Sequence, residues 1–283
     1  MKILTMTRFV NFWTYTKSIS LMFKLIISFI INRLWIILKS RKLENLAESI
    51  VCKRPYILWT PFWNYLATSL FHYRCIHENY EPTIMSVIKK ISKNIKDDSY
   101  LINVWSNVWR YAIWLSVEYW YKVIAFEPNP ETFHNLQINT LLSDSDKKVE
   151  LFNIWLWDEN WELSFATWSN CDAMAHILDD NDINSYWKNM YEGNIIQVPV
   201  KKFDDLWIEK EKVEKTRLVI MDVEWFEYHA LRWMEKTLKE FKDINIIVEI
   251  WEDHKDKEKT IDYMKSLWYK VKSIDKENRL FSK

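Results

Sequence analysis

Polar side chains that could bind a nucleotide-like ligand follow several apolar runs of this chain. Residues 103–107 follow the first run, Glu127 follows the second, and Asp158 follows a third. Asp222 and Glu224 end a fourth run. In parallel sheets, ligands bind outside the carboxyl ends of the strands, near the point where the strand order reverses. We therefore expect these side chains to converge at one edge of a sheet.

The stretch from Tyr100 to Pro130 predicts the unit that positions the first two groups. It reads as a strand over 100–104, a tight turn, a helix, and a second strand over 122–126. Glu127 then closes the second strand, where a carboxylate can accept hydrogen bonds from both hydroxyls of a ribose. A solvated loop carboxylate is the alternative, but the Pro-Asn-Pro that follows a buried strand favours the ribose reading.

The turn after the first strand carries the wrong residue type for this chemistry. Close approach of the backbone to a ligand favours glycine at positions 105 and 109, and the chain has Trp105 and Trp109 there. The whole chain contains one glycine and 18 tryptophans, together 19 of 283 residues. Glycine alone averages about 7% of residues in proteins. The tryptophan excess therefore matches the glycine deficit.

Other tryptophans also occupy sites that suit glycine. Trp120, Trp161 and Trp268 lie at predicted turns or helix ends, where a positive φ favours glycine. We hypothesise that most tryptophans stand for glycine, through a codon such as UGA that the source reads as glycine. The alternative is a truly tryptophan-rich protein that stacks on sugars or membranes. That alternative predicts tryptophan on exposed faces rather than in turns.

Charge and cysteine content narrow the classes of partner. Lys and Arg number 39 and Asp and Glu number 39, so no global field favours nucleic acid, and we expect no nucleic-acid partner. Three scattered cysteines argue against a disulfide framework and favour a reducing, cytoplasmic location. His72, Cys75 and His77 lie close together, but without a fourth ligand nearby we expect no metal site.

The N-terminal segment is apolar with interspersed polar residues. Residues 19–38 have the length of a membrane span, but they include Lys24, Asn32 and Arg33. We expect an interfacial helix with peripheral membrane contact rather than a span. A helix packed on the protein's own surface explains the segment equally well. The expected division is an N-terminal helical or irregular segment over 1–77 and a second domain over 78–283.

The remaining pattern predicts the fold. Residues 217–223 and 244–250 are continuous apolar runs, as in parallel strands that are buried on both faces. Residues 269–282 predict a closing hairpin. The alternation of strands and helices predicts an α/β fold with a mostly parallel sheet and an antiparallel edge. Further expectations are one strand over 149–156, an edge strand over 195–200, a helix over 203–210, a helix over 226–240 and a substrate-facing lid over 169–191.

Four blocks of the chain resemble a known family. LINVWSNVWRYA, VIAFEPNPETFHNL, NIWLWDENWELSF and VIMDVEWFEYHALRWM are similar to the FkbM family of S-adenosylmethionine-dependent methyltransferases, over about residues 78–252. The resemblance implies a Rossmann-like class I methyltransferase fold with helices on both faces. Asn103 replaces a usual aspartate and Ser106 a usual alanine. The family has glycine at the positions of Trp105, Trp109, Trp157, Trp161, Trp225 and Trp233.

The resemblance also implies roles for individual residues. The cofactor would be S-adenosylmethionine, and the reaction O-methylation of a hydroxylated small molecule or glycan. Glu127 would hold the ribose, Asp158 would lie near the adenine, and Asp222 and Glu224 would lie by the transferred methyl group or the acceptor hydroxyl. Asp222 would remove the hydroxyl proton. The methionine part of the cofactor would contact the turn formed by Asn103, Trp105, Ser106, Asn107 and Trp109.

Two other functions remain open at this point. If the tryptophans are literal, an indole at 105 obstructs the turn, and the domain would be a degenerate, non-catalytic binding module. A Rossmann dehydrogenase is disfavoured, because positions 105 and 109 are four apart and do not give G-x-G-x-x-G spacing. We expect His229 and His254 to be surface residues rather than catalytic bases.

Overall fold

The structure is a computed structural model, and its chain divides into two compact units, Met1–Tyr73 and Arg74–Lys283. In the first unit, β1 (Tyr56–Trp59) pairs antiparallel with β2 (Asn64–Ala67). The residues that the structure describes are 56–59, 64–67, 81–93, 95, 98–107, 110–156, 162–166, 176–177, 195–223 and 226–283.

Several sequence-based expectations fall outside these ranges. The predicted interfacial helix over 19–38 and the cluster from His72 to His77 lie outside the described residues, as does most of the predicted lid. The boundary between residues 77 and 78 stays a prediction. Within the described ranges, no helix is long and apolar enough to cross a membrane.

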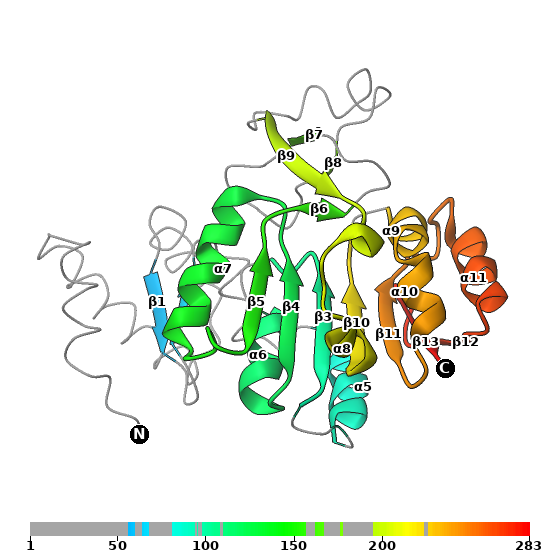
Figure 1. The fold of residues 1–283 in the computed structure, drawn as a ribbon, viewed down its shortest axis with the longest axis horizontal. Coiled ribbons are helices and arrows are strands. Elements are labelled where there is room, and N and C mark those ends of the chain that lie inside the picture. Colours follow the sequence, from blue (N-terminus) through cyan, green and yellow to red (C-terminus); the bar gives the residue numbers. More distant parts are fainter. Residues whose placement is uncertain are drawn as a thin grey trace, which may run out of the picture. The chain divides into compact units, whose positions relative to one another are not determined.

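The second unit is organised around a seven-stranded sheet in the order β12-β13-β11-β10-β3-β4-β5 (Figure 1). The five neighbouring strands from β11 to β5 are parallel, and β13 and β12 continue the sheet in antiparallel fashion beyond β11. This confirms the predicted mostly parallel sheet with an antiparallel C-terminal hairpin. The strands are β3 (Tyr100–Val104), β4 (Lys122–Phe126), β5 (Val149–Phe152), β10 (Thr216–Met221), β11 (Asn245–Glu249), β12 (Lys270–Ser273) and β13 (Asn278–Ser282).

The apolar runs form central strands because both faces of the sheet are covered. Ile102, Ile124, Val219 and Ile246 are register partners across four neighbouring strands, and each is fully buried. Full burial of a side chain of this size stabilises the fold by about 1.5–3 kcal/mol. This row is the centre of the hydrophobic core.

Helices connect the parallel strands. The chain steps from β3 to β4 to β5 in one direction, then returns to β10 and continues to β11 in the other direction. Because such crossovers are right-handed, the two directions place their helices on opposite faces of the sheet. The helices are α5 (Pro82–Ser92), α6 (Arg110–Glu118), α7 (Pro130–Leu142), α8 (Lys210–Glu214), α9 (Glu227–Trp233), α10 (Glu235–Glu240) and α11 (Lys257–Ser266).

A second sheet has the order β6-β9-β7-β8 and lies at the carboxyl ends of the parallel strands (Figure 1). Its strands are β6 (Trp155–Leu156), β7 (Glu162–Ala166), β8 (His176–Ile177) and β9 (Ile195–Lys201). The single strand expected over 149–156 is therefore two strands in different sheets. Asn153 separates them, and its side-chain amide donates to the carbonyls of Glu127 and Pro128.

Strand β9 corrects another expectation. It lies between β6 and β7, so the prediction of an edge strand from Pro199 was wrong. Strand β6 pairs only with Val200 and Lys201, so Pro199 lies beyond that ladder and does not interrupt it.

Neither of the helices predicted over 203–210 and 226–240 is a single helix. The first range holds a 3₁₀ turn, η4 (Phe203–Asp205), residues 206–209 are not helical, and α8 begins only at Lys210. The second is broken at Met234 into α9 and α10. Asp204 stabilises the start of α10, because its carboxylate accepts hydrogen bonds from the N–H groups of Lys236 (2.8 Å) and Thr237 (3.0 Å). These backbone donors have no partner within the helix.

We predict that Asp204→Ala lowers the free energy of unfolding by about 1 kcal/mol, the usual cost of losing a helix cap. Urea denaturation followed by circular dichroism measures the change. The matched control is Asp205→Ala, which removes the exposed carboxylate next to it in the same turn. Equal effects of the two substitutions would contradict the capping role.

Candidate functional site

The strand register brings the predicted site residues into one row. Val104 pairs with Met221 on one side and with Phe126 on the other. Phe126 pairs with Phe152, and Met221 with Val248. The next residues of the five strands are Glu249, Asp222, Trp105, Glu127 and Asn153. The strand order reverses at β3 and β10, so Trp105 and Asp222 lie at the switch point where ligands bind in such sheets.

The turn after β3 is fastened to the neighbouring strand. Trp105 and Asn107 both have positive φ, at 62° and 51°. Between them, the Ser106 N–H donates to the carbonyl of Phe126 at 2.8 Å. The Ser106 hydroxyl donates to the carbonyl of Asn103 at 3.0 Å, which closes the turn on itself.

Glu127 joins this turn to the segment after β4. Its side chain is fully buried, and Oε2 accepts from the N–H of Asn107 at 2.8 Å. Oε1 accepts from the N–H of Asn129 at 3.0 Å. Hydrogen bonds to an ionised carboxylate are stronger than those between neutral groups. The carboxylate is therefore fixed beside the turn, and its role in ribose binding stays a prediction.

Asn103 places a polar side chain at the end of β3. It is 1% exposed, and its Oδ1 has no hydrogen-bond partner within the described residues. A buried acceptor of this kind is unfavourable and calls for an explanation such as a bound ligand. Asn103, like Glu127, therefore fits a nucleoside-like cofactor at this edge.

The indole of Trp105 does not fit the same cofactor. Its ring is 4.9 Å from the ring of Trp155 and nearly perpendicular to it. Trp155 in turn lies 6.3 Å from the ring of Phe226. The three rings meet beside the switch point, where the fold places a ligand. The polar side of the site thus suits the cofactor, whereas the side chain at 105 takes up the space beside it.

A buried pair extends the site beyond β10. Glu227 begins α9, and its Oε2 lies 3.1 Å from Nε2 of His254. Both side chains are almost fully buried. His254 Nδ1 accepts from the N–H of Asp256 at 2.9 Å, so the proton of the neutral ring is on Nε2, the nitrogen that lies nearer the carboxylate. The expectation that His254 is a surface residue was therefore wrong.

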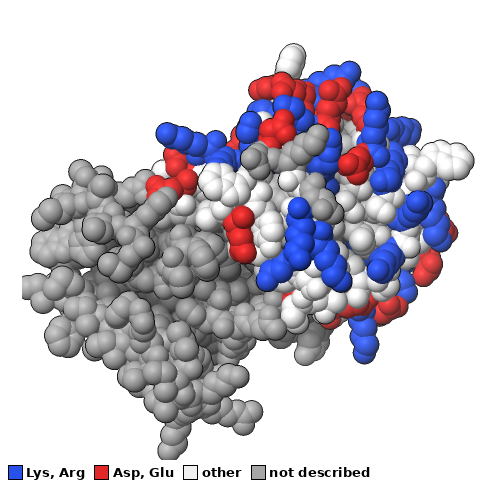
Figure 2. Space-filling view, turned by 90° about the horizontal axis from the view of Figure 1, so that it is seen from below, with Lys and Arg blue, Asp and Glu red and all other residues white. Residues whose placement is uncertain are grey.

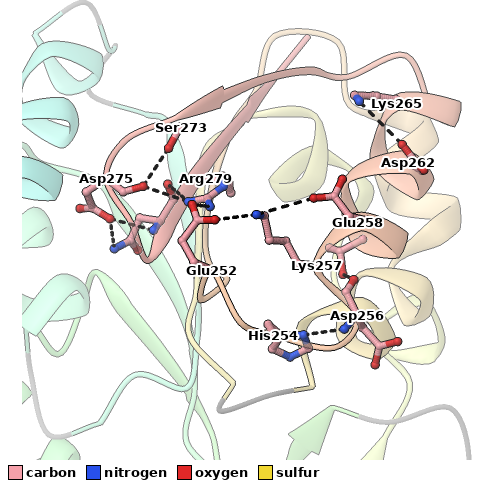
Figure 3. Close-up of polar contacts among 12 residues, drawn as sticks. Glu252, His254, Asp256, Lys257, Glu258, Asp262, Lys265, Ser273, Asp275 and Arg279 are labelled. Carbon is pink, nitrogen blue, oxygen red and sulfur yellow. Dashed lines mark hydrogen bonds and ion pairs between the residues drawn. The ribbon is translucent and has the colours of Figure 1, made fainter.

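The loop that carries His254 is held by ion pairs (Figure 3). Glu252 lies 2.6 Å from both Lys257 and Arg279. The hydrogen bond from Lys257 lowers the pKa of the Glu252 carboxyl group. The buried Arg279 guanidinium also donates to the carbonyl of Asp275 in the turn between β12 and β13. Although charged residues surround His254 in the sequence, the loop folds back onto α9 and buries the imidazole against Glu227.

Sequence reasoning did not single out Glu227. Its only local signal is an acidic residue in the first turn of a helix, which is common because of the helix dipole. Trp109, Asp158 and Glu224 lie outside the described residues, so their predicted roles stay predictions. His229 is half-buried and lies among aromatic rings, 5.8 Å from that of Trp233. Over the described ranges, no group of three His, Cys, Asp or Glu residues is arranged to hold a metal ion.

Solved structures with a similar arrangement include several methyltransferases. M. jannaschii TYW2 in complex with AdoMet is 13% identical, with 80% of this chain and 83% of that chain covered and a TM-score of 0.40. A putative rRNA-methylase from Clostridium thermocellum is 12% identical over 70% and 93%, with a TM-score of 0.42. A precorrin-6y C5,15-methyltransferase from Geobacter metallireducens is 11% identical over 69% and 85%, with a TM-score of 0.39. Likenesses at this level add nothing about substrate.

The family follows from the sequence itself. Residues 92–271, more than half of the chain, match the Methyltransferase FkbM domain. A search of curated proteins gives no significant match. The matched range contains the turn after β3, Glu127 and Asp222, which the sheet register aligns at one edge. This chain therefore belongs to the FkbM methyltransferase family, whose cofactor is S-adenosylmethionine.

Proposed function

We propose that this methyltransferase methylates a hydroxyl oxygen of a small molecule or glycan. The observation that carries the proposal is the row of residues at the carboxyl ends of the parallel strands. Trp105 follows β3, Asp222 follows β10 on one side of β3, and Glu127 follows β4 on the other side. Glu127 marks the cofactor side of the row. Asp222 is thereby the carboxylate next to the position where the acceptor would meet the cofactor.

On the cofactor side, the residues bind and orient. Glu127 would hold the ribose hydroxyls, and its bonds to Asn107 and Asn129 fix the direction of its carboxylate. Asn103, Ser106 and Asn107 would form the turn beside the methionine part. S-adenosylmethionine supplies a methyl group that its sulfonium already activates, so alignment of the acceptor is the main task of the protein.

On the acceptor side, Asp222 would accept the proton of the hydroxyl group as its oxygen is methylated. It is half-buried, directly after a buried strand. Glu224 would assist at the same edge, and Asp158 would contact the adenine. The Glu227–His254 pair supports the wall of the acceptor site through the start of α9.

The charge distribution bears on nucleic acid as a partner. The formal net charge is zero, and positive and negative side chains are interspersed over the described part of the face that Figure 2 shows, which lies at the amino ends of the parallel strands. A protein that binds nucleic acid relies on a concentrated positive surface. We therefore retain the proposal of no nucleic-acid partner. Cytoplasmic location, membrane contact through residues 19–38 and the domains 1–77 and 78–283 also remain proposals.

A non-catalytic binding module is the second candidate. The observation in its favour is the Trp105 indole, which packs on Trp155 at the switch point. This candidate predicts that the chain binds its partner without S-adenosylmethionine.

Calorimetry with S-adenosylmethionine distinguishes the methyltransferase from the binding module. It is carried out on two proteins, one with glycine at position 105 and one with the printed sequence. We expect the glycine protein to bind and then to transfer labelled methyl groups to polyhydroxylated acceptors. Products that survive mild alkali identify ethers rather than methyl esters. Failure of both proteins to bind the cofactor would refute the enzyme and leave the binding module.

We predict that Glu127→Gln abolishes cofactor binding and lowers the free energy of unfolding by about 1–3 kcal/mol, because an amide NH₂ would face one of two buried N–H donors. Calorimetry and urea denaturation measure the two effects. Glu131→Gln, an exposed acidic residue in the first turn of α7, is the control. Unchanged cofactor affinity in Glu127→Gln would contradict the assigned role.

We predict that Asp222→Asn lowers kcat by about 10²–10⁴-fold, the usual contribution of a general base, and leaves cofactor affinity unchanged. Steady-state kinetics over a pH range, combined with calorimetry, measures both quantities. Asp243→Asn changes an exposed aspartate far from this edge and serves as the control. A parallel loss of cofactor affinity would assign Asp222 to binding instead.

A further inference from the structure

We infer that the natural protein carries glycine at positions 105, 120 and 268, where the printed sequence has tryptophan. The inference goes beyond the proposed function, because it rests on backbone geometry at three separate places. Only one of the three lies at the candidate site.

The first support is the set of left-handed residues. Six non-glycine residues in the described ranges have positive φ, and three of them are tryptophans. Their φ angles are 62° at Trp105, 63° at Trp120 and 69° at Trp268. Asn107 and Asp144 are of types that tolerate this region, whereas a bulky residue there is an outlier. The cause is the clash of Cβ with the following carbonyl, which glycine avoids.

Trp268 occupies a helix-terminating position that glycine normally fills. After α11, the Trp268 N–H donates to the carbonyl of Lys265 at 2.9 Å. The Tyr269 N–H donates to the carbonyl of Met264 at 3.1 Å. This pair of bonds is a Schellman motif, and the residue in the Trp268 position is left-handed and usually glycine. The indole is 87% exposed, while Met264 and Tyr269 are buried.

Trp120 repeats the situation at the end of α6. The N–H groups of Tyr119 and Tyr121 both donate to the carbonyl of Leu115, at 3.1 and 3.4 Å. The chain reverses at Trp120 so that Tyr121, which is fully buried, can enter the core before β4. The Trp120 indole is 60% exposed and lies under the ammonium of Lys148. The turn thus needs the left-handed backbone of residue 120, whereas its mostly exposed side chain contacts Lys148 at the surface.

A shared stacking surface does not explain the three indoles. Trp105 follows the carboxyl end of β3, whereas Trp120 precedes the amino end of β4. Because these strands are parallel neighbours, the two residues lie at opposite edges of the sheet. Sugar or membrane stacking requires aromatic rings on one surface. The positive φ is the property that the positions share.

At position 105, glycine would also remove the indole that takes up space beside the polar side of the candidate site. It removes the ring that packs on Trp155 and leaves the bonds of Ser106 and Asn107 to β4 and Glu127 in place. Trp155 and Trp233 are buried in the core, and their backbone geometry makes no comparable demand. The inference therefore applies to the three left-handed positions.

Peptide mass spectrometry of the protein isolated from its source cells tests the inference directly. Trypsin releases residues 97–110, 111–122 and 266–270, which contain positions 105, 120 and 268 in turn. We expect the sequence of each fragment, read by fragmentation in the mass spectrometer, to have glycine at that position, because residues 97–110 and 111–122 each contain a second tryptophan, Trp109 and Trp114. Tryptophan at these positions in the natural protein overturns the inference. The result does not depend on cofactor binding, so it is separable from a failure of the proposed function.

Recombinant variants of the printed sequence test the geometry independently. Trp120→Gly and Trp268→Gly should each raise the melting temperature by about 2–4 °C, the shift expected in a chain of this size when left-handed strain is relieved. The matched control is Trp207→Gly, which removes a fully exposed indole at a position without positive φ and should give no rise. A fall in melting temperature for both test variants would contradict the backbone argument.

Discussion

The carboxylate of Glu127 is the constraint on which the candidate site depends. Its two oxygens accept backbone N–H groups from the turn after β3 and from the segment after β4. One side chain therefore sets the spacing of two neighbouring loops, and the Ser106 N–H adds a third tie to β4. Buried charge is favourable only when it is paired or hydrogen-bonded in this way. The arrangement gives a rigid polar wall at the switch point of the sheet.

Sheet register extends this wall into a site. Parallel pairing aligns the carboxyl ends of five strands, so residues far apart in sequence become neighbours at one edge. Asp222 comes to lie beside the turn after β3 through strand pairing alone, whereas Glu227 needs the start of α9 and the loop from β11. The packed core sets the position of Asp222. The position of Glu227 relative to His254 also depends on the ion pairs of the partly exposed Glu252 with Lys257 and Arg279.

This difference explains what the sequence could predict. Strands β3 and β4, and hence Glu127 beside the turn, follow from apolar runs and an acidic residue at their end. The split of 149–156 into two strands and the break at Met234 depend on partners distant in sequence, Glu127 and Asp204. Burial of His254 depends on a loop folding back. The pattern of residue types within one segment does not predict contacts with residues that are distant in the sequence.

The position of β13 has a consequence for how the protein is made. Arg279, in this last strand, is the buried partner of Glu252 in the loop that carries His254. Strand β13 also pairs along the whole of β11. Because domains generally fold as units, the sheet is complete only after this strand has been synthesised. Until residue 279 has been added, β11 lacks its antiparallel neighbour and Glu252 lacks its buried partner, so the surroundings of His254 are completed late.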